Sequence, residues 1–190
     1  MRLFTAVPLP AHAHRSLVAA VDSVVDLDGG PRWSARDLWH VTLVFLGEVD
    51  DAGLPRLRRE LAGAVAAAAG PMPFTVRLSG AGTFPGGRRP QVLWIGVDGE
   101  VDRLAALARA VRRAARRGRV EVESRPYHPH VTLGRWRARE GASREAVQRL
   151  ADYTGPEFHV DRFTLYRSHP PTEPGAQHRH EPMDSWPLAG

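Results

Sequence analysis

The chain has 190 residues, 43% of them hydrophobic, so it is long enough and apolar enough to bury a core as one compact domain. It contains no cysteine, which excludes disulfide bonds, thiol nucleophiles and cysteine-based zinc sites. The net charge of +5 favours an anionic partner such as nucleic acid. All 26 basic residues are arginine, however, a bias that also fits a GC-rich genome and weakens the argument from charge.

The first half of the chain is predicted to alternate strands and helices, because its apolar residues recur first at every second position and then at helical spacing. The expected elements are a strand over residues 2–8, a helix over 11–25, a strand over 39–46 and a helix that runs through residue 69, capped by Asp50 or Asp51.

The second half is predicted to contain more strands than helices. The expected elements are strands at 74–78 and 91–97 joined by a glycine-rich loop over 80–90, a helix over 101–117, a short strand at 120–122, a strand over 130–136, a helix near 143–152, one strand over 158–166 and a final strand near 178–186. This mixed order predicts an α+β fold with a mixed or antiparallel sheet in each of two similar lobes.

The tetrapeptide His-Val-Thr-Leu occurs twice, at His40–Leu43 and at His130–Leu133, about half the chain length apart. In a strand, residues two apart point to the same face, so each copy presents an imidazole beside a hydroxyl and turns Val and Leu into the core. No linker separates the two copies. We therefore expect a single domain over residues 1–190, made of two pseudo-symmetric lobes that face each other across a cleft.

The repeated residues suit acid–base chemistry on a phosphate. One imidazole accepts a proton while the other donates one, and the hydroxyls of Thr42 and Thr132 stabilise charge on phosphate oxygens. A lone histidine in a strand is most often a core or surface residue without a catalytic role. Because the motif occurs twice, a functional role is the preferred interpretation for His40 and His130. A metal site remains the main rival, although no HExxH pattern occurs and threonine is a poor zinc ligand.

Arginines supply further candidates for phosphate binding. Arg135 follows Thr132 by three positions, so strict alternation points it away from His130, and a bulge at Gly134 would return it to the cleft. Arg88 and Arg89 lie in the glycine-rich loop and are possible substrate contacts. The arginine-rich run over residues 111–119 is read as a solvated helix face rather than an RNA-binding surface.

The remaining histidine pairs and three aromatic residues carry less weight. His12 with His14 and His178 with His180 are expected to be exposed loop or terminal residues. Core packing is the preferred interpretation of Phe4 and Trp94, whereas base stacking stays open for Trp33.

No apolar run approaches the ~20 residues that cross a bilayer. The first ten residues are too short an apolar stretch, and too early broken by proline, for a signal peptide. We therefore expect a cytoplasmic protein that does not engage a membrane.

The doubled motif resembles the signature of the 2H phosphoesterase superfamily, and within it the chain is most similar to the RNA 2′,3′-cyclic phosphodiesterases, historically called 2′–5′ RNA ligases. The similarity covers nearly the whole chain. Beyond the motifs it rests on residues 2–10, Phe45-Leu46-Gly47, residues 84–94, Pro129–Arg135 and Trp186-Pro187-Leu188. The family commonly carries a tyrosine where this chain has His180.

The resemblance implies a bilobal fold with outer helices around a water-filled cleft, and hydrolysis of RNA 2′,3′-cyclic phosphate ends to 2′-phosphomonoesters without a metal or other cofactor. His40 would be the proton donor and His130 the proton acceptor, while Thr42, Thr132 and Arg135 would hold the phosphate. The expected partner is an RNA or oligonucleotide with a cyclic phosphate end, bound by a monomer. Action on 2′–5′ linkages or small cyclic nucleotides, and a non-catalytic RNA-end-binding module, remain alternatives.

Overall fold

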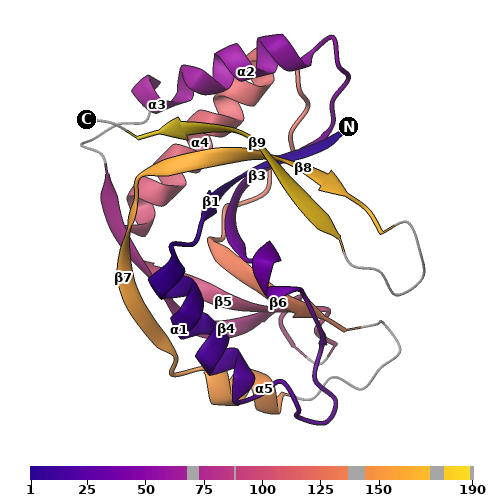
Figure 1. Cartoon of the computed structure of the whole chain (residues 1–190), viewed down its shortest axis with the longest axis vertical. Helices are drawn as coiled ribbons and strands as arrows, with labels where there is room; N and C mark the ends of the chain where they lie inside the picture. Colours follow the sequence, from indigo (N-terminus) through magenta and orange to yellow (C-terminus); the bar gives the residue numbers. More distant parts are fainter. Residues whose placement is uncertain (68–72, 88, 137–143, 172–177, 189–190) are drawn as a thin grey trace.

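Two antiparallel β-sheets form the frame of the computed structural model (Figure 1). The structure describes residues 1–67, 73–87, 89–136, 144–171 and 178–188. In chain order the elements are β1 (Arg2–Pro8), α1 (Ala11–Asp22), β2 (Arg32–Trp33), the 3-10 helix η1 (Arg36–Leu38), β3 (His40–Glu48), α2 (Leu54–Ala62), α3 (Ala64–Ala67), β4 (Phe74–Phe84), β5 (Val92–Gly99), α4 (Val101–Arg117), β6 (His130–Arg135), α5 (Glu145–Leu150), β7 (Thr154–Val160), β8 (Arg162–His169) and β9 (Arg179–Pro187).

The two sheets define two lobes that are not consecutive halves of the chain. The first sheet has the strand order β3-β1-β8-β9 and the second has the order β2-β6-β5-β4-β7. Helix α1 follows β1 of the first sheet yet packs against β4 and β7 of the second, whereas α4 follows β5 of the second sheet and packs against β3 of the first. The lobes are therefore interlocked, and β3 and β6 meet between them (Figure 1). The expected α+β class with outer helices is confirmed; the pseudo-symmetry of the lobes stays a prediction.

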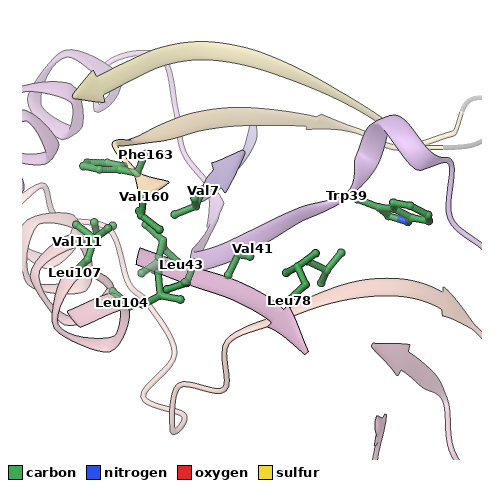
Figure 2. Close-up of a cluster of buried hydrophobic side chains, with 14 of the residues drawn as sticks. Val7, Trp39, Val41, Leu43, Leu78, Leu104, Leu107, Val111, Val160 and Phe163 are labelled. Carbon is green, nitrogen blue, oxygen red and sulfur yellow. The ribbon is translucent and has the colours of Figure 1, made fainter. Parts of the chain in front are cut away.

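The buried side chains of both sheets form one continuous hydrophobic cluster. Val41 and Leu43 of β3 point into it, as do Leu104 and Leu107 from the apolar face of α4 (Figure 2). Alternation along β3 leaves His40 and Thr42 only half-buried, between fully buried neighbours. The same pattern repeats in β6. The core thus holds both motif strands with their polar face turned away from it.

Two predictions about the extent of strands are wrong. The segment 80–90 was expected to be a loop, but β4 continues to Phe84. Gly80 adopts a positive φ of 66° at an irregularity in the pairing with β5, and a side chain at Gly82 would collide with the ring of Trp94. The glycines therefore serve a bulged strand rather than a turn.

The strand predicted over residues 158–166 is in fact two strands. β7 ends at Val160 in the second sheet and β8 begins at Arg162 in the first, so the chain changes sheet at Asp161. Buried and exposed residues alternate from Phe158 to Val160, but Asp161 and Arg162 are both exposed and Phe163 is buried, so the pattern shifts by one position where the chain changes sheet.

Three local expectations also differ from the structure. Residues 120–122 form no strand. Helix α2 starts after Gly53 without a side-chain cap, and Asp50 instead accepts a hydrogen bond from the Gly53 amide at 2.6 Å in the preceding turn. The helical region predicted through residue 69 is described only as far as residue 67, as two helices, α2 and α3.

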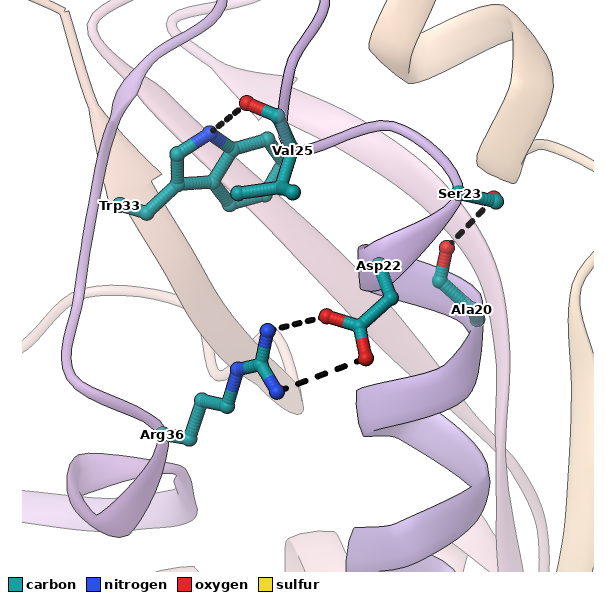
Figure 3. A network of polar contacts seen from close by, with 6 residues as sticks. All are labelled: Ala20, Asp22, Ser23, Val25, Trp33 and Arg36. Atoms are coloured by element: carbon teal, nitrogen blue, oxygen red, sulfur yellow. Dashed lines mark hydrogen bonds and ion pairs between the residues drawn. The ribbon is translucent and has the colours of Figure 1, made fainter.

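The segment that leads into β3 is anchored to the end of α1. Arg36 in η1 forms an ion pair with Asp22, and the Trp33 indole donates a hydrogen bond to the Val25 carbonyl at 3.2 Å (Figure 3). Since η1 ends two residues before His40, these contacts fix where the first motif strand begins. None of the described helices is long and apolar enough to cross a membrane.

Candidate active site

A cavity of about 420 Å³, here called the His40 cavity, lies where the two sheets meet. It is lined by four of the predicted site residues, His40 and Thr42 from β3 and Thr132 and Arg135 from β6. The other lining residues are Arg2, Leu3, Phe4, Ser34, Leu38, Phe45, Ser168, His178 and His180. The sequence motif thus brings side chains from both lobes to one place.

Arg135 reaches this cavity because β6 contains a bulge. Along the pairing with β5, Thr132 lies opposite Trp94 and Gly134 opposite Leu93, so Leu133 is an extra residue. The extra residue reverses the alternation, and Thr132 and Arg135 line the same cavity although they are three positions apart. The predicted bulge next to Gly134 is confirmed.

Gly134 itself is required by the close approach of β2. A Cβ atom there would lie 2.8 Å from the carbonyl oxygen of Arg32 and 3.0 Å from the ring of Pro31. The Ser34 amide also donates a hydrogen bond to the Leu133 carbonyl at 2.8 Å. The bulge is therefore held in place by the strand beside it.

His40 is surrounded by aromatic rings. Its imidazole stacks on Phe4, with ring centroids 4.9 Å apart, and the ring of His180 lies edge-on at 5.3 Å. The pKa of His40 is lowered to about 4, first by burial and then by the positive charge of His180. A hydrogen bond to the Leu38 backbone opposes this shift, and the charge of His130 adds to it. In the free protein His40 is therefore neutral at pH 7.

His130 occupies a similar but distinct environment. Its Nδ1 lies 2.6 Å from the His128 carbonyl, and because a carbonyl only accepts, Nδ1 carries the proton of the neutral ring. The other nitrogen, Nε2, is then free to accept a proton. Burial lowers the pKa of His130, and the charges of His128 and Arg135 lower it further.

A second cavity of about 530 Å³, here called the aromatic cavity, adjoins the first on the side of His130. Thr42 and Phe45 line both cavities, so His40 and His130 approach one region from two sides. The Tyr127 hydroxyl donates a hydrogen bond to the Thr42 carbonyl at 3.1 Å, which ties β3 to the segment before β6. The other lining residues are Leu43, Val44, Phe84, Pro85, Arg112, Glu123, Arg125, Pro126 and His128.

Other residues singled out from the sequence lie elsewhere or outside the described part. Arg88 lies outside the described residues, and the exposed Arg89 lines neither cavity. In the run 111–119 most arginines are exposed on α4 or just after it, as expected for a solvated face, but the half-buried Arg112 lines the aromatic cavity. His12 and His14 approach the backbone carbonyls of Glu157 and Arg36 and line neither cavity.

The aromatic residues Phe4, Trp94 and Trp33 lie largely as expected, whereas one residue of the pair His178 and His180 does not. Phe4 is buried and Trp94 half-buried in ring contacts, as expected, although both also touch site histidines. Trp33 is fixed by its bond to Val25 rather than placed in the cavity. The expectation that His178 and His180 are exposed residues without a role is wrong for His180, which is half-buried next to His40.

Among the residues that the structure describes, no group of three or more histidine, aspartate or glutamate side chains is placed to hold a metal ion. What the site offers is imidazole, hydroxyl and guanidinium groups, which suit proton transfer and anion binding.

Comparison with known proteins identifies the family. The RNA 2′,3′-cyclic phosphodiesterase of Escherichia coli is 32% identical over 187 residues, which cover 98% of this chain and 96% of that protein. The enzyme of the same name from Geobacillus stearothermophilus is 29% identical over 188 residues, and this chain spans 57% of its length. The crystal structure of E. coli LigT complexed with 3′-AMP matches with a TM-score of 0.75 and 29% identity, covering 100% of this chain and 98% of that one. Residues 10–171 match the profile of the 2′-5′ RNA ligase superfamily, and the chain belongs to that family.

Proposed function

We propose that this chain hydrolyses RNA 2′,3′-cyclic phosphate ends to 2′-phosphomonoesters by a two-histidine mechanism that needs no metal. The observation that carries the proposal is the convergence of His40, Thr42, Thr132 and Arg135 on one cavity, with His130 in the cavity beside it. Two imidazoles that approach one region from different sheets suit in-line displacement at phosphorus, in which a base and an acid act on opposite sides.

In this mechanism Nε2 of His130 takes a proton from water, and the water oxygen forms a bond to phosphorus. The bond between phosphorus and the 3′-oxygen breaks, and His40 gives its proton to that oxygen. Thr42, Thr132 and Arg135 donate hydrogen bonds to the phosphate oxygens, on which negative charge increases. The tautomer fixed by the His128 carbonyl supports the role of His130, since it leaves Nε2 unprotonated.

His40 must hold a proton to act as the acid, whereas in the free protein its pKa is about 4. The negative charge of a bound cyclic phosphate raises that pKa, because an opposite charge nearby favours the protonated imidazole. The hydrogen bond to the Leu38 backbone acts in the same direction. Protonation of His40 is therefore coupled to substrate binding.

The names of the relatives support the substrate. The E. coli and Geobacillus relatives are both RNA 2′,3′-cyclic phosphodiesterases, and the LigT structure contains a nucleotide, 3′-AMP. The net charge of +5 agrees with an RNA partner. The proposal includes a monomer that acts in the cytoplasm.

Turnover of a 2′,3′-cyclic mononucleotide, with and without excess chelator, tests the activity. His40→Ala and His130→Ala should each lower kcat by about 10²–10⁴-fold, the usual effect of removing a positioned acid or base. The double variant should be little worse than the poorer single one, because the pair acts as a unit. His159→Ala is the matched control, since this exposed histidine on β7 lines neither cavity.

Three outcomes would contradict the proposal. Activity abolished by chelator and restored by zinc or manganese would overturn the metal-free mechanism. A His130→Ala protein within a few-fold of the unmodified chain would remove that residue from the reaction. Tight binding of the cyclic end without turnover would indicate a non-catalytic RNA-end-binding module.

The aromatic cavity favours a second candidate, action on 2′–5′ linkages. It lies on the side of His130, from which the attacking oxygen approaches in the proposed mechanism, and its Phe45 and Phe84 offer surfaces on which a base can stack. A nucleoside 5′-hydroxyl in place of water would turn hydrolysis into ligation. The test is to incubate an oligonucleotide that has a cyclic phosphate end with excess 5′-hydroxyl oligonucleotide and to measure the 2′–5′-linked product. Absence of any such product would exclude this activity.

A further inference from the structure

His180 stands at the start of β9, directly against the proposed acid. Its ring lies 5.3 Å from that of His40, at an interplanar angle of 66°, and 4.8 Å from that of Phe4. It lines the His40 cavity together with Thr42 and Arg135. The pairing of β9 with β8 sets Ser168 opposite His180, so the strand register fixes its place at the cavity.

One ring nitrogen of His180 is buried without a partner. Nδ1 forms no hydrogen bond within the described part of the chain, although buried polar atoms in proteins are nearly always paired. This nitrogen therefore adds no hydrogen bond to the part of the fold that the structure describes, and the ring of His180 contacts Phe4 and the imidazole of His40.

We propose that His180 is a positioning residue that controls when His40 carries a proton. This inference rests on the proposed role of His40 as the acid. When the proton is on His180, its charge repels a second proton from His40. The pair then holds at most one proton until an anionic phosphate enters the cavity and stabilises the proton on His40.

The size of the effect follows from the distance between the rings. Two unit charges 5.3 Å apart repel enough to weaken proton binding about fourfold even at the dielectric constant of water, and more where water is excluded. In agreement, the charge of His180 lowers the pKa of His40 more than the charge of His130 does.

Other charged groups near His180 bear on its own protonation. Burial lowers the pKa of His180, the charge of His178 lowers it further, and the carboxylate of Asp37 in η1 raises it. Among the described residues, Arg2 and Arg135 also line the cavity, and Tyr166 on β8 stacks on Phe4 and on His40. The chain neighbours of His180 are Arg179 and Glu181, and the Glu181 carboxylate is paired with His169.

Titration of the His40 imidazole by NMR, in the full chain without substrate, tests the coupling. His180→Phe keeps the ring but removes the charge, and His180→Gln keeps hydrogen-bonding capacity without the charge. Both should strengthen proton binding by His40 about fourfold or more. His159→Gln, the same change at an exposed position outside both cavities, should leave the titration unchanged.

The same variants should move the alkaline limb of the pH profile of kcat, which reports the substrate complex, to higher pH, because an acid with a higher pKa stays protonated longer. An unchanged His40 titration in both variants, or a shift in the Phe variant alone, would overturn the proposal, since packing rather than charge would then be responsible. A shifted titration with an unmoved alkaline limb would also overturn it. If the unmodified chain failed to hydrolyse cyclic phosphates, the proposed function would fall, while the titration would still decide whether the two histidines are coupled.

Discussion

At the scale of residues, identical tetrapeptides place their histidines in different electrostatic surroundings. His40 lies against Phe4 and His180, whereas His130 lies between His128 and the guanidinium of Arg135. Neighbours contributed by other strands therefore distinguish the two imidazoles, and such a difference is what allows a pair of like groups to divide acid and base roles.

The hydroxyl of Thr132 and the guanidinium of Arg135 are predicted to act on the phosphate rather than on folding. Thr132→Val keeps the shape and strand propensity of the side chain, so the melting temperature should hardly change while kcat falls roughly 10²-fold, as when one donor to a developing charge is lost. Arg135→Lys should also weaken the enzyme, because an ammonium group cannot make a bidentate contact. Melting and kinetics are compared for each variant. A Thr132→Val protein that lost stability in proportion to activity would make this threonine a strand former only.

The lowered pKa of His40 predicts a dependence of stability on pH. Its folded value of about 4 lies below the ordinary value of 6.5, so between these pH values the unfolded chain binds more protons than the folded chain. The free energy of unfolding should therefore fall as the pH falls from about 6.5 to about 4. A pKa shift from 6.5 to about 4 corresponds to at most about 3 kcal/mol of stability.

Urea unfolding at several pH values measures this effect. His40→Gln should flatten the pH dependence, whereas His159→Gln, at an exposed position, should leave it as it is. Equal slopes for His40→Gln and the unmodified chain would mean that His40 is not held neutral by the fold.

At the scale of elements, the bulge in β6 depends on a glycine. A side chain at position 134 would press on the backbone of β2 at 2.8 Å. Gly134→Ala should therefore cost about 1–3 kcal/mol of stability, the usual range for overpacking. It should also lower kcat, because Arg135 is positioned by the same bulge. Gly86→Ala is the matched control, since nothing lies within 4 Å of a Cβ atom there. Equal stability of Gly134→Ala and Gly86→Ala would show that β2 can move aside, and that the bulge in β6 does not depend on the close approach of β2.

At the scale of the whole molecule, the two sheets should unfold together. One hydrophobic cluster spans both, and α1 and α4 each connect a strand of one sheet to the face of the other. Hydrogen exchange of the amides in β1 and β5 should therefore give similar free energies of opening, close to the global value. Markedly weaker protection in one sheet would show that the lobes are independent units.

The sequence alone determined those features that depend on neighbours along the chain. Helix α4 was predicted with its observed bounds, because its apolar positions follow the helical period and Gly118 ends it. The two motif strands and their buried Val and Leu followed from alternation in the same way. The repeated tetrapeptide predicted a site at its histidines and threonines, and the structure brings His40, Thr42 and Thr132 to one cavity and His130 to the cavity beside it.

Features that form where segments distant in sequence meet were visible only in the tertiary structure. Residues 158–166 were predicted as one strand, and a one-position shift of the apolar pattern at Asp161 does not say which strands pair on either side, so only the tertiary structure shows that β7 and β8 belong to different sheets. The role assigned to the glycines of β4 depends on the ring of Trp94, which lies on the next strand. His180 is far from His40 in sequence, and β1 and β8 separate their strands in the sheet, yet the two rings meet because both contact Phe4 of β1. Local periodicity shows which face of an element is buried, but it carries no information about which other element covers that face. The pKa of His40 depends on the elements that cover it, because the ring of His180 comes from a distant strand.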